Sequence, residues 1–172
     1  MLWGKEKTVE TQQHGMLDES QLSVFYPKIQ EFLNQVNQIV LDKNQQTQLA
    51  LCSLLAGGHI LFEDLPGLGK TTLASSLAHL AGLQFKRIQF TNDMLASDVI
   101  GVNMFNQKEH LFEFKQGPIF TQILLADEIN RCSPKTQSAL LEAMEEGVVT
   151  IDASRYVPVS YTHLRAHETV LD

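Results

Sequence analysis

Hydrophobic residues recur along the chain in two different periods, and the changes between them outline alternating helices and strands. Between residues 24 and 40, apolar side chains return every three to four positions, which is typical of a helix with one buried face. A second helical pattern covers residues 49–55 and ends at two glycines. Residues 1–20 are polar and show no period, so we expect a flexible segment there.

The stretch that follows predicts a strand, a turn, a helix and a second strand. "HILFED" is a short apolar run, "PGLG" is a turn, and "KTTLASSLAHLAG" is a helical pattern that ends at Gly82. "FKRIQF" then indicates the next strand. This order is that of one βαβ unit, which favours an α/β fold with a parallel sheet.

Two hairpins and a buried strand occupy the second half of the chain. "VNMF" and "LFEF" predict the arms of a hairpin with the polar tip "NQKEH", and "VVTIDASRYVPV" predicts another. "IFTQILLA" is almost continuously apolar, as expected of a central parallel strand covered on both faces. Between them, Ser133 and Pro134 suit the start of a helix that Gly147 would close.

The turn in "LFEDLPGLGKTTLA" has the chemistry of a phosphate-binding loop. Glycines allow the backbone N–H groups to converge on a phosphate at a helix N-terminus, a lysine contacts the outer phosphates, and a hydroxyl completes a magnesium shell. Gly67, Gly69, Lys70 and Thr71 meet these needs. Asp64 stands where the common pattern has its first glycine, and a simple tight turn is the alternative.

The acids that end "ILLADE" strengthen the nucleotide interpretation. A carboxylate at the end of a strand beside the loop strand can hold Mg²⁺, directly or through water, and Asp127 can do this. Glu128 can polarise an attacking water, which makes it the candidate catalytic residue. Alone, the pair could merely terminate a buried strand; the upstream loop favours a nucleotide hydrolase.

Composition narrows the choice of partner and compartment. The chain of 172 residues is 44% hydrophobic and 19% charged, with a net charge of −7, so nucleic acid is an unfavoured partner. Its two cysteines have no pairing motif, the N-terminus has no apolar signal core, and no apolar run is long enough to span a membrane. We therefore expect a cytoplasmic protein.

Several ordered blocks together resemble the MoxR family of AAA+ ATPases, with an AAA_3-type core. They are "LLAGGHILFEDLPGLGKTTLA", "RIQFTNDMLASDVIGV", "FEFKQGPIFTQILLADEINRCSPKTQSALLEAMEEG" and "VTID", within residues 32–159. The resemblance implies an αβα P-loop NTPase core with a parallel sheet and a β-hairpin insert. It also implies ATP and Mg²⁺ as cofactors, and Asp64 is a variant that the family contains.

The resemblance assigns the site residue by residue. Asp127 and Glu128 form Walker B, with Thr71 and Asp127 on the metal, and the adenine packs at Ile39 and Val40. The Walker A loop is assigned to nucleotide binding, with the residues Pro66, Gly67, Leu68, Gly69, Lys70, Thr71 and Thr72. The implied assembly is a homo-oligomeric ring, a hexamer, that remodels or matures protein complexes as a chaperone-like ATPase. Proteins with von Willebrand factor A domains are among the implied partners.

The end of the chain departs from the family pattern. We divide the chain into the flexible segment 1–20, a partial ATPase core at 21–159, and a tail at 160–172 that resembles foreign tails on truncated reading frames. The sensor, arginine finger and lid of the family would follow residue 159. On this hypothesis the fold is incomplete at the C-terminus, the sheet lacks its last strand, and ATP hydrolysis is poor. Genomic sequence that spans codon 159 would test the hypothesis.

Some alternatives stay open at this point. Arg131 could contact a neighbouring subunit or tie down the segment after the acids. Thr91 or Asn92 could orient Glu128 or cap a loop. We expect inert packing for Cys132. For the whole chain, a nucleic-acid-remodelling AAA+ motor and a fragment that binds nucleotide without efficient hydrolysis are the alternative functions.

Overall fold

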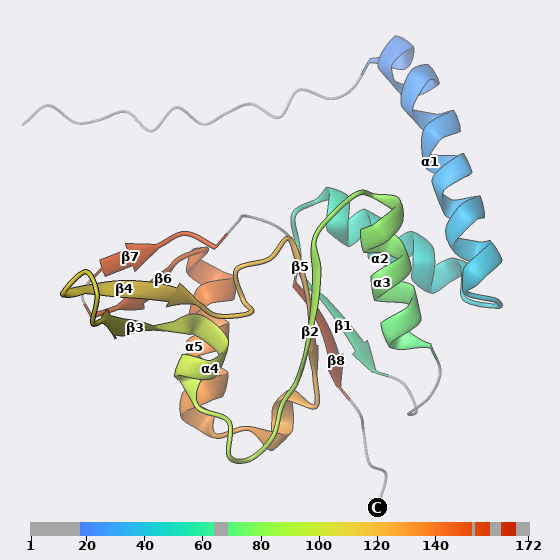
Figure 1. Ribbon diagram of the computed structural model, residues 1–172. Helices are drawn as coiled ribbons and strands as arrows, with labels where there is room; N and C mark the ends of the chain where they lie inside the picture. Colours follow the sequence, from blue (N-terminus) through green and yellow to red (C-terminus); the bar gives the residue numbers. More distant parts are fainter. Residues whose placement is uncertain (1–17, 64–68, 153, 159–162, 168–172) are drawn as a thin grey trace, which may run out of the picture.

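A four-stranded parallel sheet with the order β1-β8-β5-β2 lies at the centre of the fold (Figure 1). The computed structural model describes residues 18–63, 69–152, 154–158 and 163–167. All three pairings within this sheet are parallel. Its strands are β1 (Ile60–Glu63), β2 (Phe85–Gln89), β5 (Ile123–Asp127) and β8 (His163–His167).

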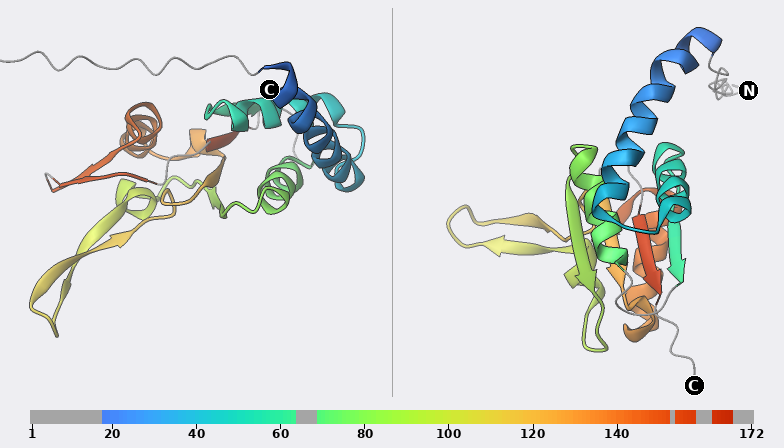
Figure 2. Two further views of the ribbon diagram at one scale, coloured as in Figure 1. Left: turned by 90° about the horizontal axis from the view of Figure 1, so that it is seen from above. Right: turned by 90° about the vertical axis from the view of Figure 1, so that its right-hand side faces the viewer.

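Helices cover both faces of the sheet, which gives three layers (Figures 1 and 2). One layer contains α1 (Glu19–Ile39), α2 (Asn44–Leu55) and α3 (Lys70–Leu80). The other contains α4 (Ala96–Ile100), the short 3-10 helix η1 (Ile129–Arg131) and α5 (Pro134–Glu146). The αβα P-loop architecture expected from the sequence is therefore confirmed.

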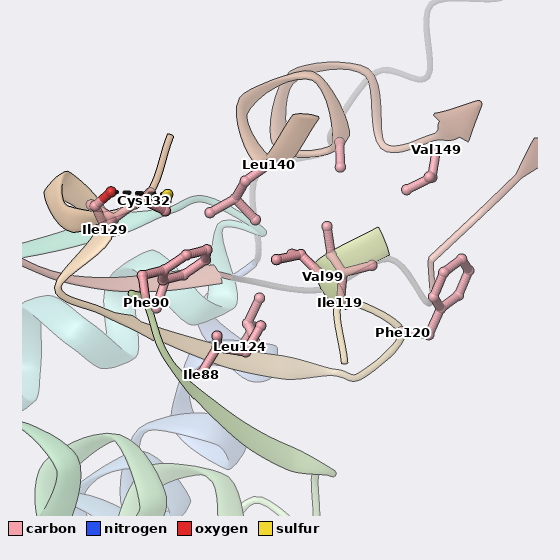
Figure 3. Close-up of a cluster of buried hydrophobic side chains, with 12 residues drawn as sticks. Ile88, Phe90, Val99, Ile119, Phe120, Leu124, Ile129, Cys132, Leu140 and Val149 are labelled. Atoms are coloured by element: carbon pink, nitrogen blue, oxygen red, sulfur yellow. Dashed lines mark hydrogen bonds between the residues drawn. The ribbon is translucent and has the colours of Figure 1, made fainter. Parts of the chain in front are cut away.

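The side chains of β5 alternate between the two helical layers. Leu124 and Ala126 pack with α4 and α5 in a cluster of twelve buried residues, and Figure 3 shows Leu124 and Ile88 of β2 beneath Leu140 of α5. Ile123 and Leu125 point the other way, into a cluster with two alanines of α3. Every residue of β5 is buried, as the apolar run predicts for a central strand.

Two hairpins extend from the α4–α5 side of the molecule (Figure 1). The first joins β3 (Gly101–Asn106) to β4 (Leu111–Gln116), and the second joins β6 (Val149–Ile151) to β7 (Ser154–Tyr156). The rings of Phe114 and Tyr156 stack between them, with centroids 3.9 Å apart. Both hairpins were predicted from the sequence.

Glycine is required at the base of the first hairpin, because the backbone of its two arms meets there. Gly101 has φ +99°, and a Cβ on it would collide with the carbonyl oxygen of Lys115. A Cβ on Gly117 would collide with the carbonyl oxygen of Val99, at the end of α4. The hairpin is thus joined to α4 by direct backbone packing.

The first helix begins earlier than its hydrophobic period predicts. Asp18 accepts a hydrogen bond from the backbone N–H of Gln21 at 2.7 Å, and the Gln21 side chain accepts one from the Asp18 N–H at 3.2 Å. This reciprocal capping box starts α1 at Glu19. Residues 1–17 lie outside the described part of the chain.

The sheet contains a strand from the segment after residue 159, whereas the sequence predicts a sheet that lacks its last strand. β8 pairs with β1 on one side and β5 on the other, so the gap between them is filled. The polar sequence "HLRAH" does not suggest a central strand, but sheet pairing requires only backbone N–H and C=O groups. Among the described residues, no helix combines the length and apolar character needed to cross a bilayer.

Candidate nucleotide site

The topology brings the end of β1 and the end of β5 to one edge of the sheet. Phe62 of β1 and Asp127 of β5 both align with Ala166 of β8, which lies between the two strands. The strand that leads into the glycine loop and the acidic strand end are therefore level. At one strand spacing of about 4.8 Å each, they are about 10 Å apart.

The N-terminus of α3 supplies the described part of the predicted phosphate-binding loop. Gly69 caps the helix in the left-handed conformation (φ +80°, ψ +17°), which favours glycine. Among the described residues other than those next to it in the chain, none lies within 4 Å of where a Cβ on Gly69 would stand. Lys70, Thr71 and Thr72 form the first turn, where helical N–H groups have no partner within the helix and attract anions. Asp64, Pro66, Gly67 and Leu68 lie outside the described residues.

Asp127 ends β5 on the face that carries Ile123 and Leu125, which is the face toward α3. The residue is only 7% exposed. Arg87 of β2 donates two hydrogen bonds to its carboxylate, from Nε at 3.0 Å and from Nη2 at 2.5 Å, and both reach Oδ2. Sequence reasoning missed Arg87; its signal was an arginine two positions before the end of a strand that neighbours the acidic one.

Glu128 leaves the strand in a conformation that is uncommon for a residue other than glycine. Its φ and ψ are +57° and +39°, and it is 8% exposed. Arg131 of η1 donates from Nε to Glu128 Oε2 at 2.8 Å. Arg131 thus ties down the segment after the acids, one of the two roles considered for it.

The two residues assigned to the adenine separate in the structure. Val40 is buried and lines a small pocket together with Phe62 of β1 and the first residues of α3, Gly69 and Lys70. Ile39 is 53% exposed and does not line this pocket. The structure brings Val40 to the N-terminal end of α3 and leaves Ile39 on the surface.

The remaining polar candidates near the acids have local roles. The Thr91 hydroxyl bonds the carboxylate of Asp93 and lowers its pKa, and the Thr91 carbonyl accepts the Met94 N–H at 3.2 Å, as in a loop cap. Cys132 is buried, its Sγ donates to the carbonyl of Ile129 at 3.2 Å (Figure 3), and burial raises the pKa of its thiol. A raised pKa makes the thiol unreactive, in line with inert packing.

The oxygen donors at this edge of the sheet fit magnesium. The described residues hold no cluster of three or more His, Cys, Asp or Glu side chains, which excludes an all-protein cage among them. Magnesium is instead held by one or two carboxylates together with phosphate oxygens and water. The Asp127 carboxylate and the Thr71 hydroxyl are hard oxygen donors of that kind, and a guanidinium already stands beside Asp127 as its counter-charge.

The chain is similar in sequence and in fold to known proteins. The sequence profile of the family described as "ATPase family associated with various cellular activities (AAA)" matches residues 59–168. The chain is 54% identical over 127 residues to the uncharacterized protein YeaC of Bacillus subtilis, covering 74% of this chain and 40% of YeaC. It is 42% identical over 117 residues to the chaperone MoxR1 of Mycobacterium tuberculosis, covering 68% of this chain and 31% of MoxR1.

A crystal structure from Cytophaga hutchinsonii, of a protein assigned provisionally as an ATPase, superposes with a TM-score of 0.73. It is 41% identical, and the match covers 88% of this chain and 47% of that one. The chain thus belongs to the AAA family of ATPases. Within that family it is MoxR-like, as the resemblance predicted. It spans less than half the length of each of these three proteins.

Proposed function

We propose that the protein binds ATP with Mg²⁺ and hydrolyses it, as a chaperone-like ATPase that remodels or matures protein complexes. The observation that carries this proposal is the buried pair Asp127 and Glu128 at the end of β5, level with the strand that leads to the α3 N-terminus. Phosphoryl transfer depends mainly on positioning and charge neutralisation, and two buried carboxylates at this point of the sheet would serve both.

Each residue has a defined task in this proposal. The first turn of α3 and the Lys70 ammonium hold the outer phosphates. Asp127 and Thr71 would hold the magnesium ion, which neutralises charge on the phosphate oxygens. Glu128 accepts a hydrogen bond from the attacking water and takes its proton. Pro66, Gly67 and Leu68 are proposed to complete the loop around the phosphates.

The proposed assembly, compartment and partners of the protein rest on its relatives. In a homo-oligomeric ring, a hexamer, the ATP site would lie between subunits. The proposed compartment is the cytoplasm, where free cysteines such as Cys52 and Cys132 are the norm. Protein clients are favoured by the name of the M. tuberculosis chaperone MoxR1. Von Willebrand factor A domain proteins remain proposed partners. The division of the chain at residue 160 also remains a proposal, with the described part of that tail paired into the sheet as β8.

Nucleotide binding is tested with Lys70→Ala and the matched control Lys115→Ala, which removes an exposed lysine from β4. Loss of a charge-assisted hydrogen bond of about 1.5–3 kcal/mol should weaken ATP binding by roughly 10- to 150-fold in the first variant only. Titration of a fluorescent ATP analogue measures this. An unchanged affinity in Lys70→Ala would refute the assignment.

Measuring ATP hydrolysis with and without DNA distinguishes the alternative function, a nucleic-acid-remodelling motor, from the proposed chaperone-like ATPase. The described hairpin carries Lys108 and Lys115 beside Glu109 and Glu113, so its formal charges cancel. A surface of that kind gives phosphate backbones little attraction. We expect no stimulation, and strong stimulation by DNA would favour the motor. Nucleotide binding without measurable turnover would favour the third alternative, a fragment that only binds.

A further inference from the structure

In the protein without a bound metal ion, the negative charge of Asp127 needs a positively charged partner. The carboxylate is almost fully buried, and an unpaired buried charge is strongly destabilising. Arg87 supplies the opposite charge in this structure, through two N–H groups on one oxygen, Oδ2. The metal-free fold at this edge of the sheet therefore depends on a side chain that no Walker motif includes.

The geometry lets Arg87 reach the carboxylate along the sheet and withdraw from it. Arg87 aligns with Leu125 on the neighbouring strand, two positions before Asp127, so its side chain runs toward the edge where the acid lies. The Arg87 side chain is 44% exposed, while that of Asp127 is 9% exposed. The guanidinium can therefore return to water at little cost, whereas the carboxylate stays in place.

A guanidinium and a dication on one carboxylate repel each other. If Mg²⁺ arrives at Asp127 with its nucleotide, the two cations compete for the same negative charge, and each weakens the other by the same factor. A pair with a purely structural role, pointing away from the metal position, would not show this coupling. Asp127 shares its face of β5 with Ile123 and Leu125, which pack against α3, the helix that begins at the proposed phosphate site.

On the basis of the proposed function, we propose that Arg87 is a positioning residue that holds Asp127 in the metal-free state and competes with Mg²⁺ for it. Arg87 keeps the carboxylate fixed and ready at the edge of the sheet. Binding of magnesium with a nucleotide weakens the Arg87–Asp127 pair. Loss of Arg87 then has opposite effects on the empty and the loaded protein.

The experiment measures the melting temperature of the full chain in two conditions. The first is EDTA without nucleotide; the second is a fixed saturating concentration of a non-hydrolysable ATP analogue with increasing MgCl₂. For Arg87→Gln we expect a lower melting temperature in EDTA. We also expect the Mg²⁺ concentration for the half-maximal rise to fall roughly fivefold or more. An unchanged or higher Mg²⁺ requirement would overturn the proposal.

Arg155→Gln is the matched control, because it removes an arginine from an exposed ion pair. Arg155 Nη2 lies 3.6 Å from Glu146 Oε2, with both side chains more than half exposed. This variant should leave the Mg²⁺ requirement unchanged, and a shift equal to that of Arg87→Gln would count against a specific role for Arg87.

A conservative variant keeps the test decisive if Arg87→Gln fails to fold. Arg87→Lys retains a cation but not the forked donors, so its Mg²⁺ requirement should lie between those of the other two proteins. A requirement equal to or above wild type would overturn the proposal. Failure of the proposed function looks different, because the wild-type chain itself would then show no rise in melting temperature with Mg²⁺ and the analogue.

Discussion

At the start of α3 the candidate site relies on backbone, whereas at the end of β5 it relies on buried charge. Gly69 contributes a left-handed turn, and the helix contributes N–H groups. Asp127 contributes a carboxylate that would be costly to bury without Arg87, and Glu128 adds a second buried carboxylate that Arg131 contacts. The phosphate side therefore depends on dihedral angles, and the acidic side on its ion partners.

The largest expected effect is on turnover, at the acidic side. Glu128→Gln keeps the shape of the side chain but removes its basicity, so we expect the rate of ATP hydrolysis to fall by about 10²–10⁴. Affinity for ATP should stay within about twofold, since the phosphate side is intact. Steady-state hydrolysis and nucleotide titration measure the two. Glu142→Gln, on an exposed position of α5, is the control. If Glu128→Gln hydrolyses ATP at the wild-type rate, Glu128 is not the catalytic residue.

A stability comparison sharpens the contrast between the two helical layers. Leu124 and Leu125 are adjacent, fully buried residues of β5 that face opposite layers. Replacing either with alanine should lower the free energy of unfolding by about 2–5 kcal/mol. We expect Leu124→Ala to cost more, because its cluster contains twelve buried residues and that of Leu125 four. Urea unfolding decides the order, and the reverse order would show that cluster size does not set the cost.

The smallest effect concerns the pair of Arg131 and Glu128. The Arg131 side chain is 61% exposed, so solvent screens the interaction. A double-mutant cycle with Arg131→Gln and Glu128→Gln should give a coupling energy of about 1 kcal/mol or less. The free energies of unfolding of the four proteins supply the cycle. A coupling well above about 2 kcal/mol would mean that this pair behaves as a buried one.

The residues that the sequence predicts well are those with a strong local signal. The helical period of residues 24–40, the apolar run that becomes β5, and the Ser133 and Gly147 boundaries of α5 all have a direct cause in local physics, and the structure confirms them. Of the site, Lys70, Asp127 and Glu128 follow from motif chemistry, and the topology brings the first turn of α3 to the edge where the acids lie. Their catalytic and metal roles stay predictions.

Features set by contacts across the sheet were not predictable in the same way. Arg87 forms its ion pair with a residue forty positions later, which becomes visible only once the register of β2 and β5 is known. β8 was missed because "HLRAH" lacks the apolar signature of a central strand. Val40 and Ile39 were treated as equivalent neighbours, but only the packing against α3 shows which one is buried.

The glycines at the base of the β3–β4 hairpin have a consequence for how this sequence can vary. Along the arms, exposed side chains such as Phe112 and Met104 leave room for exchange. Gly101 and Gly117 leave none, since any side chain would push the arms away from α4. Over evolutionary time, the hairpin can therefore change what it presents to its surroundings, while its anchorage to the ATPase core stays fixed.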